Sequence, residues 1–231
     1  MLKFSARALI FLALVASTFA WHESFNEGWS DRWVHSSHEK YGGRFDVAAP
    51  LNKLASDLAL KVRPFQPPST HLITSHIITS HTPPLILPPS PTSFSLSPLL
   101  QVTEKARHYG LTTSLPTPID PSSQPIVLQY DVKLADGLSC GGAYLKFLTA
   151  DPTFTPINLV DNTPYTVMFG PDKCGGTNKV HLIIRHKSPK TGEIEEKHLS
   201  SPPSVIDDDL THTYTAILYP STNTYAVLID G

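Results

Sequence analysis

Two cysteines, each in a glycine-containing motif, constrain this chain more than any other feature. Cys140 opens the string CGGAYLKF at residues 140–147, and Cys174 lies near the end of PYTVMFGPDKCGG at residues 164–176. Glycine beside cysteine allows two backbone segments to approach closely, as a disulfide between neighbouring strands or loops requires. The motifs therefore predict two adjacent segments joined by a covalent link.

Residues 1–20 have the layout of a cleaved secretory signal. A positively charged start precedes an apolar run over residues 8–15, and small residues lead to Ala20, after which we expect cleavage. An oxidising secretory route favours a disulfide between Cys140 and Cys174, the one intramolecular pairing that two cysteines allow. A structural link without any role in recognition is the alternative at this point.

Length and charge exclude some classes of protein. The chain has 231 residues and a formal net charge of -2. This length can bury the core of one β-sandwich, and the near-neutral charge disfavours electrostatic capture of nucleic acid or of an anionic membrane. After residue 20, no stretch reaches the roughly 18 to 20 consecutive apolar residues of a membrane helix. We therefore expect a soluble mature chain that does not bind nucleic acid.

Residues 62–101 differ in composition from the rest of the chain. They contain nine prolines, twelve serines and threonines, and a single charged residue, Arg63. Within them HLITSHIITSH repeats every five residues, a period that fits neither a helix nor a strand. We predict a low-complexity insertion without regular structure, which divides one folding unit into residues 21–61 and 102–231.

Two origins of this insertion stay open. Its ends, Val62-Arg63 and Gln101, are encodable by GTACGT and CAG, which match common intron boundaries, and a five-residue repeat suits a translated fifteen-base repeat. A retained intron is the favoured hypothesis. A genuine surface loop is the alternative, because each doubling of loop length costs only about 0.6 kcal/mol of closure entropy.

Outside the insertion, the pattern predicts short strands separated by turns. β-branched and aromatic residues concentrate in six runs, at residues 126–133, 144–148, 165–169, 179–186, 214–218 and 225–229. Alternation in the fourth run places Val180, Leu182 and Ile184 on one face, which should be core. Turn residues at 188–192 and 220–223 predict two hairpins. The chain therefore reads as an all-β antiparallel sandwich.

Three further strings add to the two cysteine motifs. They are SFNEGWSDRW at residues 24–33, HLIIRHKSPKTGEIEEKHL at residues 181–199 and THTYTAILYPSTNTYAVLIDG at residues 211–231. Together the five strings resemble the calnexin and calreticulin family, and they lean towards calnexin. The resemblance implies a concanavalin-like antiparallel jelly roll. Because the family completes this domain with strands that return after a proline-rich arm, the resemblance also implies a sandwich that is incomplete at its carboxyl terminus.

The resemblance implies a sugar-binding face around the cysteine pair. The residues that match the family's contacts to the terminal glucose of a monoglucosylated high-mannose glycan are Tyr144, Lys146, Tyr165 and Asp172. Met168 and the bridge between Cys140 and Cys174 would line the same surface. A neutral sugar requires aromatic faces against its ring and fixed hydrogen-bonding groups for its hydroxyls, which these residue types supply. Packing within a sheet is the alternative role for the two tyrosines.

The function implied by the resemblance is that of a calcium-dependent lectin chaperone of the endoplasmic reticulum. It would bind monoglucosylated N-glycans on unfolded glycoproteins, with a protein disulfide isomerase-type partner if the whole protein has the family's arm. The family's calcium ligands include backbone carbonyls that correspond to Ser24 and Asp57. A calcium cluster at Asp207-Asp208-Asp209 is the weaker candidate, because the spacing fits no known loop, and we expect a solvated turn there.

Two other functions stay open. A secreted concanavalin-like glycan hydrolase needs a carboxylate pair across a concave face. The nearest candidates, Glu193, Glu195 and Glu196, lie on one hairpin arm, where neighbours point to opposite faces and we expect exposure to solvent. An enzyme is therefore not expected. The remaining possibility is the non-functional product of a truncated gene.

Overall fold

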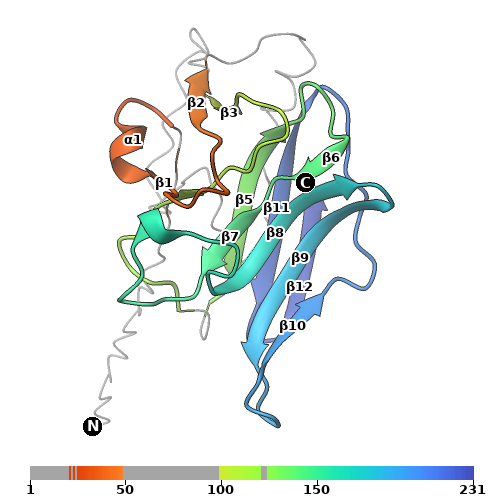
Figure 1. Ribbon diagram of the computed structural model, residues 1–231. Helices are drawn as coiled ribbons and strands as arrows, with labels where there is room; N and C mark the ends of the chain where they lie inside the picture. Colours follow the sequence, from red (N-terminus) through yellow and green to blue (C-terminus); the bar gives the residue numbers. More distant parts are fainter. Residues whose placement is uncertain (1–20, 22, 24, 49–98, 121–123) are drawn as a thin grey trace, which may run out of the picture.

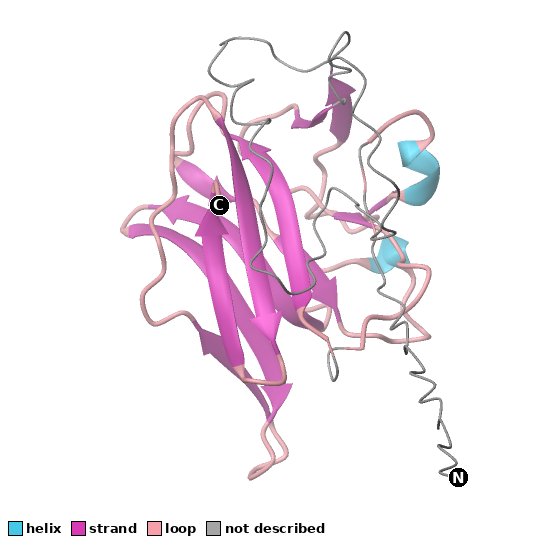
Figure 2. Ribbon diagram, turned by 180° about the vertical axis from the view of Figure 1, so that it is seen from behind, coloured by secondary structure: helices cyan, strands magenta, loops and turns pink. Residues whose placement is uncertain are grey.

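The computed structural model describes residues 21, 23, 25–48, 99–120 and 124–231. These residues form mainly β-strands (Figure 2), accompanied by a short helix, α1 (Trp29–Arg32), and a turn of 3-10 helix, η1 (Pro156–Asn158). None of the helices in these ranges has the length and apolar character to cross a membrane. The predicted signal at residues 1–20 and residues 62–98 of the predicted insertion lie outside the described residues.

Five strands form the larger antiparallel sheet, in the order β10-β9-β8-β6, with β7 also paired to β8. Strand β8 is central, and β6 and β7 pair with successive parts of its other edge (Figure 1). The strands are β6 (Cys140–Gly142), β7 (Leu145–Leu148), β8 (Tyr165–Cys174), β9 (Thr177–Lys187) and β10 (Ile194–His198).

A three-stranded antiparallel sheet packs against the larger one. Its order is β12-β11-β5, and in Figure 1 it lies behind β8 and β9. The strands are β5 (Ile126–Lys133), β11 (Thr211–Tyr219) and β12 (Thr224–Ile229). All six strands that the sequence pattern predicted are present, and the fold is the expected antiparallel sandwich.

The core lies between these two sheets. Alternation along each strand directs every second side chain inward, and the buried cluster comprises Ile126, Leu128, Val167, Phe169, Val180, Leu182, Tyr214 and Ala216. Full burial of a side chain such as Phe169 contributes about 1.5–3 kcal/mol. Val180 and Leu182 are 0% and 2% exposed, as the alternation predicted. Ile183, on the opposite face of β9, is nevertheless only 5% exposed.

Both predicted hairpin turns are confirmed. The amide of Gly192 donates to the carbonyl of Ser188 at 2.9 Å in the turn that joins β9 to β10. The amide of Asn223 donates to the carbonyl of Pro220 at 3.3 Å in the turn that joins β11 to β12. Gly192 and Asn223 both have positive φ, which glycine and asparagine tolerate better than other residues.

Two small sheets accompany the sandwich. One pairs β1 (Val34–His35) with β4 (Leu111–Thr112), and the other pairs β2 (Phe45–Ala48) with β3 (Leu99–Val102). Residues 99–101 lie at the end of the predicted insertion, so the expectation that all of it lacks regular structure was wrong there. Leu99, Leu100 and Gln101 form ladder pairs with β2, and the two leucines are half-buried.

Candidate ligand-binding face

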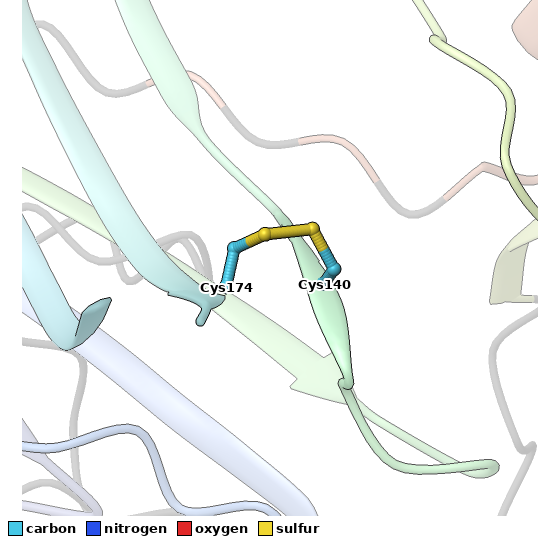
Figure 3. The surroundings of a disulfide bond; sticks show 2 residues. All are labelled: Cys140 and Cys174. Atoms are coloured by element: carbon cyan, nitrogen blue, oxygen red, sulfur yellow. A yellow bond between two sulfur atoms is a disulfide. The ribbon is translucent and has the colours of Figure 1, made fainter. Parts of the chain in front are cut away.

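The predicted disulfide between Cys140 and Cys174 is present. The two cysteines stand directly opposite each other in the ladder between β6 and β8, with their Cα atoms 4.0 Å apart (Figure 3). Strand β6 has only three residues, so the bridge supplements a short ladder with a covalent bond. The bridge thereby fixes the segment that leads into Tyr144 and β7.

The outer face of the larger sheet carries most of the side chains that the sequence predicted. Met168 and Asp172 alternate with the buried Val167 and Phe169 along β8, and therefore lie on the face away from the core. In the ladder, Met168 stands opposite Lys146 of β7 on one side and opposite Ile183 of β9 on the other. Met168 and Ile183 thus form an apolar strip in the middle of this face.

Tyr165 reaches the outer face because β8 contains a bulge. Phe147 pairs with Val167, but the next residue of β7, Leu148, pairs with Tyr165, which leaves Thr166 as an extra residue. Simple alternation would have placed Tyr165 on the same face as the buried Val167. The extra residue shifts this phase by one position and re-aims the tyrosine towards the charged side chains of the outer face.

Tyr165 lies among two cations and a carboxylate. The Lys146 ammonium is 5.1 Å from the centre of the Tyr165 ring, and the Arg185 guanidinium carbon is 5.0 Å from it. The Tyr165 hydroxyl donates to Glu196 Oε1 at 2.9 Å. Burial, this hydrogen bond and the charge of Glu196 together raise the pKa of Tyr165 to about 12, so the hydroxyl keeps its proton. Burial also lowers the pKa of Lys146.

A second polar cluster lies on the other side of the apolar strip. His181 Nε2 is 3.0 Å from Asp172 Oδ2, and the ring of Tyr144 contacts the His181 ring edge-on at 6.1 Å. Burial, the charge of Asp172 and a hydrogen bond to it raise the pKa of Tyr144, whose hydroxyl therefore remains a donor. His198 links the two clusters, because its ring lies 6.5 Å from that of His181 and its Nε2 lies 3.4 Å from Glu196 Oε2.

The position of Tyr144 depends on a contact that crosses the core. The Tyr130 hydroxyl, from β5 of the opposite sheet, donates to the Ala143 carbonyl at 2.7 Å. Gly170 makes room for this contact, because a Cβ there would lie 2.1 Å from the Ala143 oxygen and 2.2 Å from the Tyr130 oxygen. The Ala143 amide also donates to the Pro171 carbonyl at 3.0 Å. The residue before Tyr144 is therefore held from both sides.

The sequence patterns did not single out several residues that join this face. Glu196 was expected to be merely solvent-exposed, and its side chain is indeed 43% exposed, yet it pairs with Tyr165 and Arg185. His181 and Arg185 alternate with the predicted core residues of their strand, which was the available signal that they lie on the face away from the core. Glu196 stands opposite Arg185 in the ladder between β10 and β9, a relation that the hairpin register determines.

The aspartates expected to form a solvated turn are partly engaged. Asp207 accepts a hydrogen bond from the Leu138 amide at 2.7 Å and forms an ion pair with Lys173. Asp208 accepts from the Leu210 amide at 2.8 Å and contacts His212. The turn therefore ties the segment before β6 to the end of β8, a structural role that the expectation of a purely solvated turn missed.

The predicted calcium ligands are two backbone carbonyls. Ser24 and Asp57 both lie outside the described residues. Within the described part of the chain, no group of three or more His, Cys, Asp or Glu side chains is arranged to hold a metal ion.

Comparison with known proteins agrees with this fold. The model of the calreticulin family matches residues 88–231. Calnexin homolog 1 of Arabidopsis thaliana is 53% identical over 133 residues, which are 57% of this chain and 25% of the relative. Calmegin of Mus musculus is 45% identical over 136 residues, 57% of this chain and 22% of the relative.

A solved structure is also similar. The globular domain of T. cruzi calreticulin superposes with a TM-score of 0.58 at 27% sequence identity, covering 87% of this chain and 58% of that domain. The chain matches only about a quarter of the length of the curated relatives. Since the family model covers more than half of its residues, the chain belongs to the calreticulin family.

Proposed function

We propose that this chain contributes the sugar-binding face of a lectin chaperone, which binds monoglucosylated N-glycans on unfolded glycoproteins in the endoplasmic reticulum. Membership of the calreticulin family and similarity to calnexin and calmegin support the proposal. The observation that carries it is the outer face of the larger sheet, where an apolar strip separates two clusters of paired polar side chains. The proposal assigns binding, without catalysis.

The chemistry of this face suits a neutral polyol. The cations Lys146 and Arg185 are accompanied by two carboxylates, those of Asp172 and Glu196, so the charges of these four side chains balance. The half-buried Met168, backed by the buried Ile183 beside it, offers an apolar surface to the C–H side of a pyranose ring. The surrounding donors and acceptors are already oriented by one another, which lowers the entropic cost of binding.

The position of the bridge is consistent with the proposed role. Tyr144, Lys146, Tyr165, Met168 and Asp172 are the residues proposed to contact the sugar. All of them lie on β7 or β8 or directly before β7, and the bridge between Cys140 and Cys174 joins β6 to the end of β8. Loss of the bridge should therefore disturb sugar binding as well as stability.

Calcium and the protein partners complete the proposal. Calcium would be bound by the backbone carbonyls of Ser24 and Asp57, as the family resemblance implies, and would stabilise the fold. A protein disulfide isomerase-type partner would join if the whole protein carries the family's arm. Isothermal calorimetry with calcium tests whether calcium binds, and thermal unfolding in calcium and in chelator tests whether it stabilises the fold. Equal melting temperatures in the two conditions would contradict the proposed stabilisation.

The test of the sugar site is a pair of ligands that differ by one hexose. We expect the full chain to bind glucose-capped oligomannose in a calorimeter and not to bind the uncapped glycan. A chimera in which the 133 matched residues replace those of the Arabidopsis relative provides a second host for the same face. Equal binding of the two glycans, or binding of neither in both proteins, would refute the proposal.

Four substitutions then locate the site. Tyr144→Phe, Lys146→Ala, Tyr165→Phe and Asp172→Ala should each weaken binding while leaving the fold intact. Loss of a neutral hydrogen bond costs about 0.5–1.5 kcal/mol, and loss of a charged one about 1.5–3 kcal/mol. Tyr225→Phe is the matched control, because this tyrosine is 51% exposed on β12 of the other sheet. Wild-type affinity in all four variants would place the sugar site elsewhere.

A further inference from the structure

We infer that His181 is a positioning residue of the ligand-binding face, which holds the Asp172 carboxylate in the orientation that receives a sugar hydroxyl. This inference rests on the proposed function and extends it to a residue that the sequence patterns did not select. His181 Nε2 lies 3.0 Å from Asp172 Oδ2, and the two side chains are only 14% and 23% exposed. A carboxylate accepts hydrogen bonds only, so the Nε2 atom is the donor.

The register of the sheet brings these two residues together. His181 stands opposite Gly170 in the ladder between β9 and β8, and Gly170 has no side chain to contact it. Asp172 is the next residue of β8 on the same face, diagonal to His181 and within reach of its ring. A larger residue at position 170 would also collide with the Ala143 carbonyl, so the glycine serves both arrangements.

Asp172 is held from two neighbouring strands. His181 donates to it from β9, and Tyr144 hydrogen-bonds to it from the position directly before β7. An ionised carboxylate has about four acceptor positions, so these two bonds leave acceptor capacity for a ligand. Because the orientation is set before the ligand arrives, little side-chain freedom is lost on binding. A freely rotating Asp172 side chain would lose more conformational entropy when the ligand binds.

The His181 ring is itself fixed in place. It contacts the Tyr144 ring at 6.1 Å and the His198 ring at 6.5 Å, and β9 has hydrogen-bonded neighbours on both sides. A side chain that is packed on two sides and lies on an inner strand is well suited to orient a partner. His186, further along the same strand, is exposed and so lacks this packing.

The experiment compares His181→Leu with His181→Gln in the full chain. Leucine removes the donor, and we expect the affinity for glucose-capped oligomannose to fall about tenfold. Glutamine keeps an N–H donor of similar reach, and we expect its affinity to stay within about threefold of wild type. His186→Leu, at the exposed end of the same strand, should bind as wild type does. Equal weakening by leucine and glutamine would show that the ring only packs.

A double-mutant cycle separates positioning from a structural effect. If His181 acts through Asp172, then His181→Leu should weaken binding in the wild-type background and have no further effect in an Asp172→Asn background. Thermal unfolding of the same four proteins reports on stability, where a purely structural effect would persist in both backgrounds. A tenfold loss of affinity in both backgrounds would overturn the inference.

A measurement without ligand distinguishes failure of this inference from failure of the proposed function. Long-range proton–nitrogen NMR spectra of the neutral imidazole show which ring nitrogen carries the proton. We expect it on Nε2 of His181 in the wild type, with a nitrogen shift that changes in Asp172→Ala. Absence of glycan binding with this signature present refutes only the proposed function. A proton on Nδ1 of His181, or a nitrogen shift that stays the same in Asp172→Ala, overturns the inference.

Discussion

Gly170 shows how one missing side chain organises its surroundings. Its φ is +146°, and the space that a Cβ would occupy is taken by the Ala143 carbonyl and the Tyr130 hydroxyl. The same absence leaves His181 free to reach Asp172. A residue without chemistry of its own therefore supports two contacts of the candidate face.

Gly170→Ala is expected to destabilise the fold by about 2 to 3 kcal/mol, because the added methyl must displace a backbone carbonyl and a buried hydroxyl. Chemical denaturation measures the free energy of unfolding. Gly176→Ala is the matched control, since a Cβ at Gly176 meets nothing within 4 Å, and its effect should stay within about 0.5 kcal/mol. Equal effects of the two substitutions would contradict this view of Gly170.

Glu23 is a carboxylate that hydrogen-bonds to several residues between positions 25 and 33, which are called the amino-terminal segment here together with Trp21 and Glu23. It accepts hydrogen bonds from Arg32 Nη2 at 2.8 Å, from Trp33 Nε1 at 2.9 Å and from the Phe25 amide at 2.7 Å. Burial alone would raise its pKa, but these bonds and the charge of Arg32 lower the pKa of Glu23 to about 2. The charged form is therefore the one that the folded segment stabilises.

Acid should release this segment. A carboxyl whose pKa is lower in the folded state stabilises the fold fully above its ordinary pKa of 4.5 and loses this contribution as the pH falls towards 2. All three tryptophans, Trp21, Trp29 and Trp33, lie in this segment, so tryptophan fluorescence reports on it alone. Between pH 4.5 and 2 we expect a fluorescence transition in the wild type and in the control Glu27→Gln. If the Glu23→Gln variant still shows this fluorescence transition, then titration of Glu23 is not its cause.

At the scale of elements, strands differ in how strongly their own residues specify them. The runs that form β5, β9 and β11 alternate or cluster β-branched and aromatic residues, and the predicted strands were found. Strand β6 reads CGG and β10 reads IEEKH, and neither has an apolar pattern. These two strands exist because β8 and β9 offer backbone partners beside them, and because a hairpin or a disulfide brings them into register.

The disulfide should be most important for strand β6. In the loop-entropy model, a bridge between residues 34 positions apart stabilises the fold by about 3 to 4 kcal/mol. Replacing Cys140 and Cys174 together by alanine should lower the free energy of unfolding by about 2 to 5 kcal/mol, as chemical denaturation measures. Non-reducing peptide mapping confirms the bridge in the wild-type control. An unchanged free energy would mean that the ladder alone holds β6.

For the molecule as a whole, the main question is which residues of the insertion contribute to the stability of the fold. Its composition predicts no contribution to the fold, but the structure assigns residues 99–101 to β3. Deleting residues 62–98 should leave the free energy of unfolding within about 0.5 kcal/mol of the wild type. Deleting residues 62–101, the matched comparison, should lower the free energy of unfolding further, because β2 loses three of its four ladder partners.

Both deletions are measured by chemical denaturation. A cost above about 2 kcal/mol for the shorter deletion, a range typical of lost core contacts, would make the insertion a working part of the fold and would count against the intron hypothesis. Sequencing the transcript across codons 55–110 tests that hypothesis directly. An uninterrupted match between genomic and mature transcript sequence, with translation of the segment, would instead favour a genuine loop.

The sequence by itself determined the all-β class, the six core strands, two hairpin turns and the cysteine pairing. The strands and turns depend on local alternation and on turn residues, which one stretch of chain specifies without its neighbours. The pairing follows from the count, because two cysteines permit a single intramolecular bridge. The tertiary structure decided which side chains share a face. The bulge at Thr166 re-aims Tyr165, and ladder register brings Glu196 to Arg185 and His181 to Asp172. Register between strands depends on how hairpins close and sheets pack, so no single segment contains it.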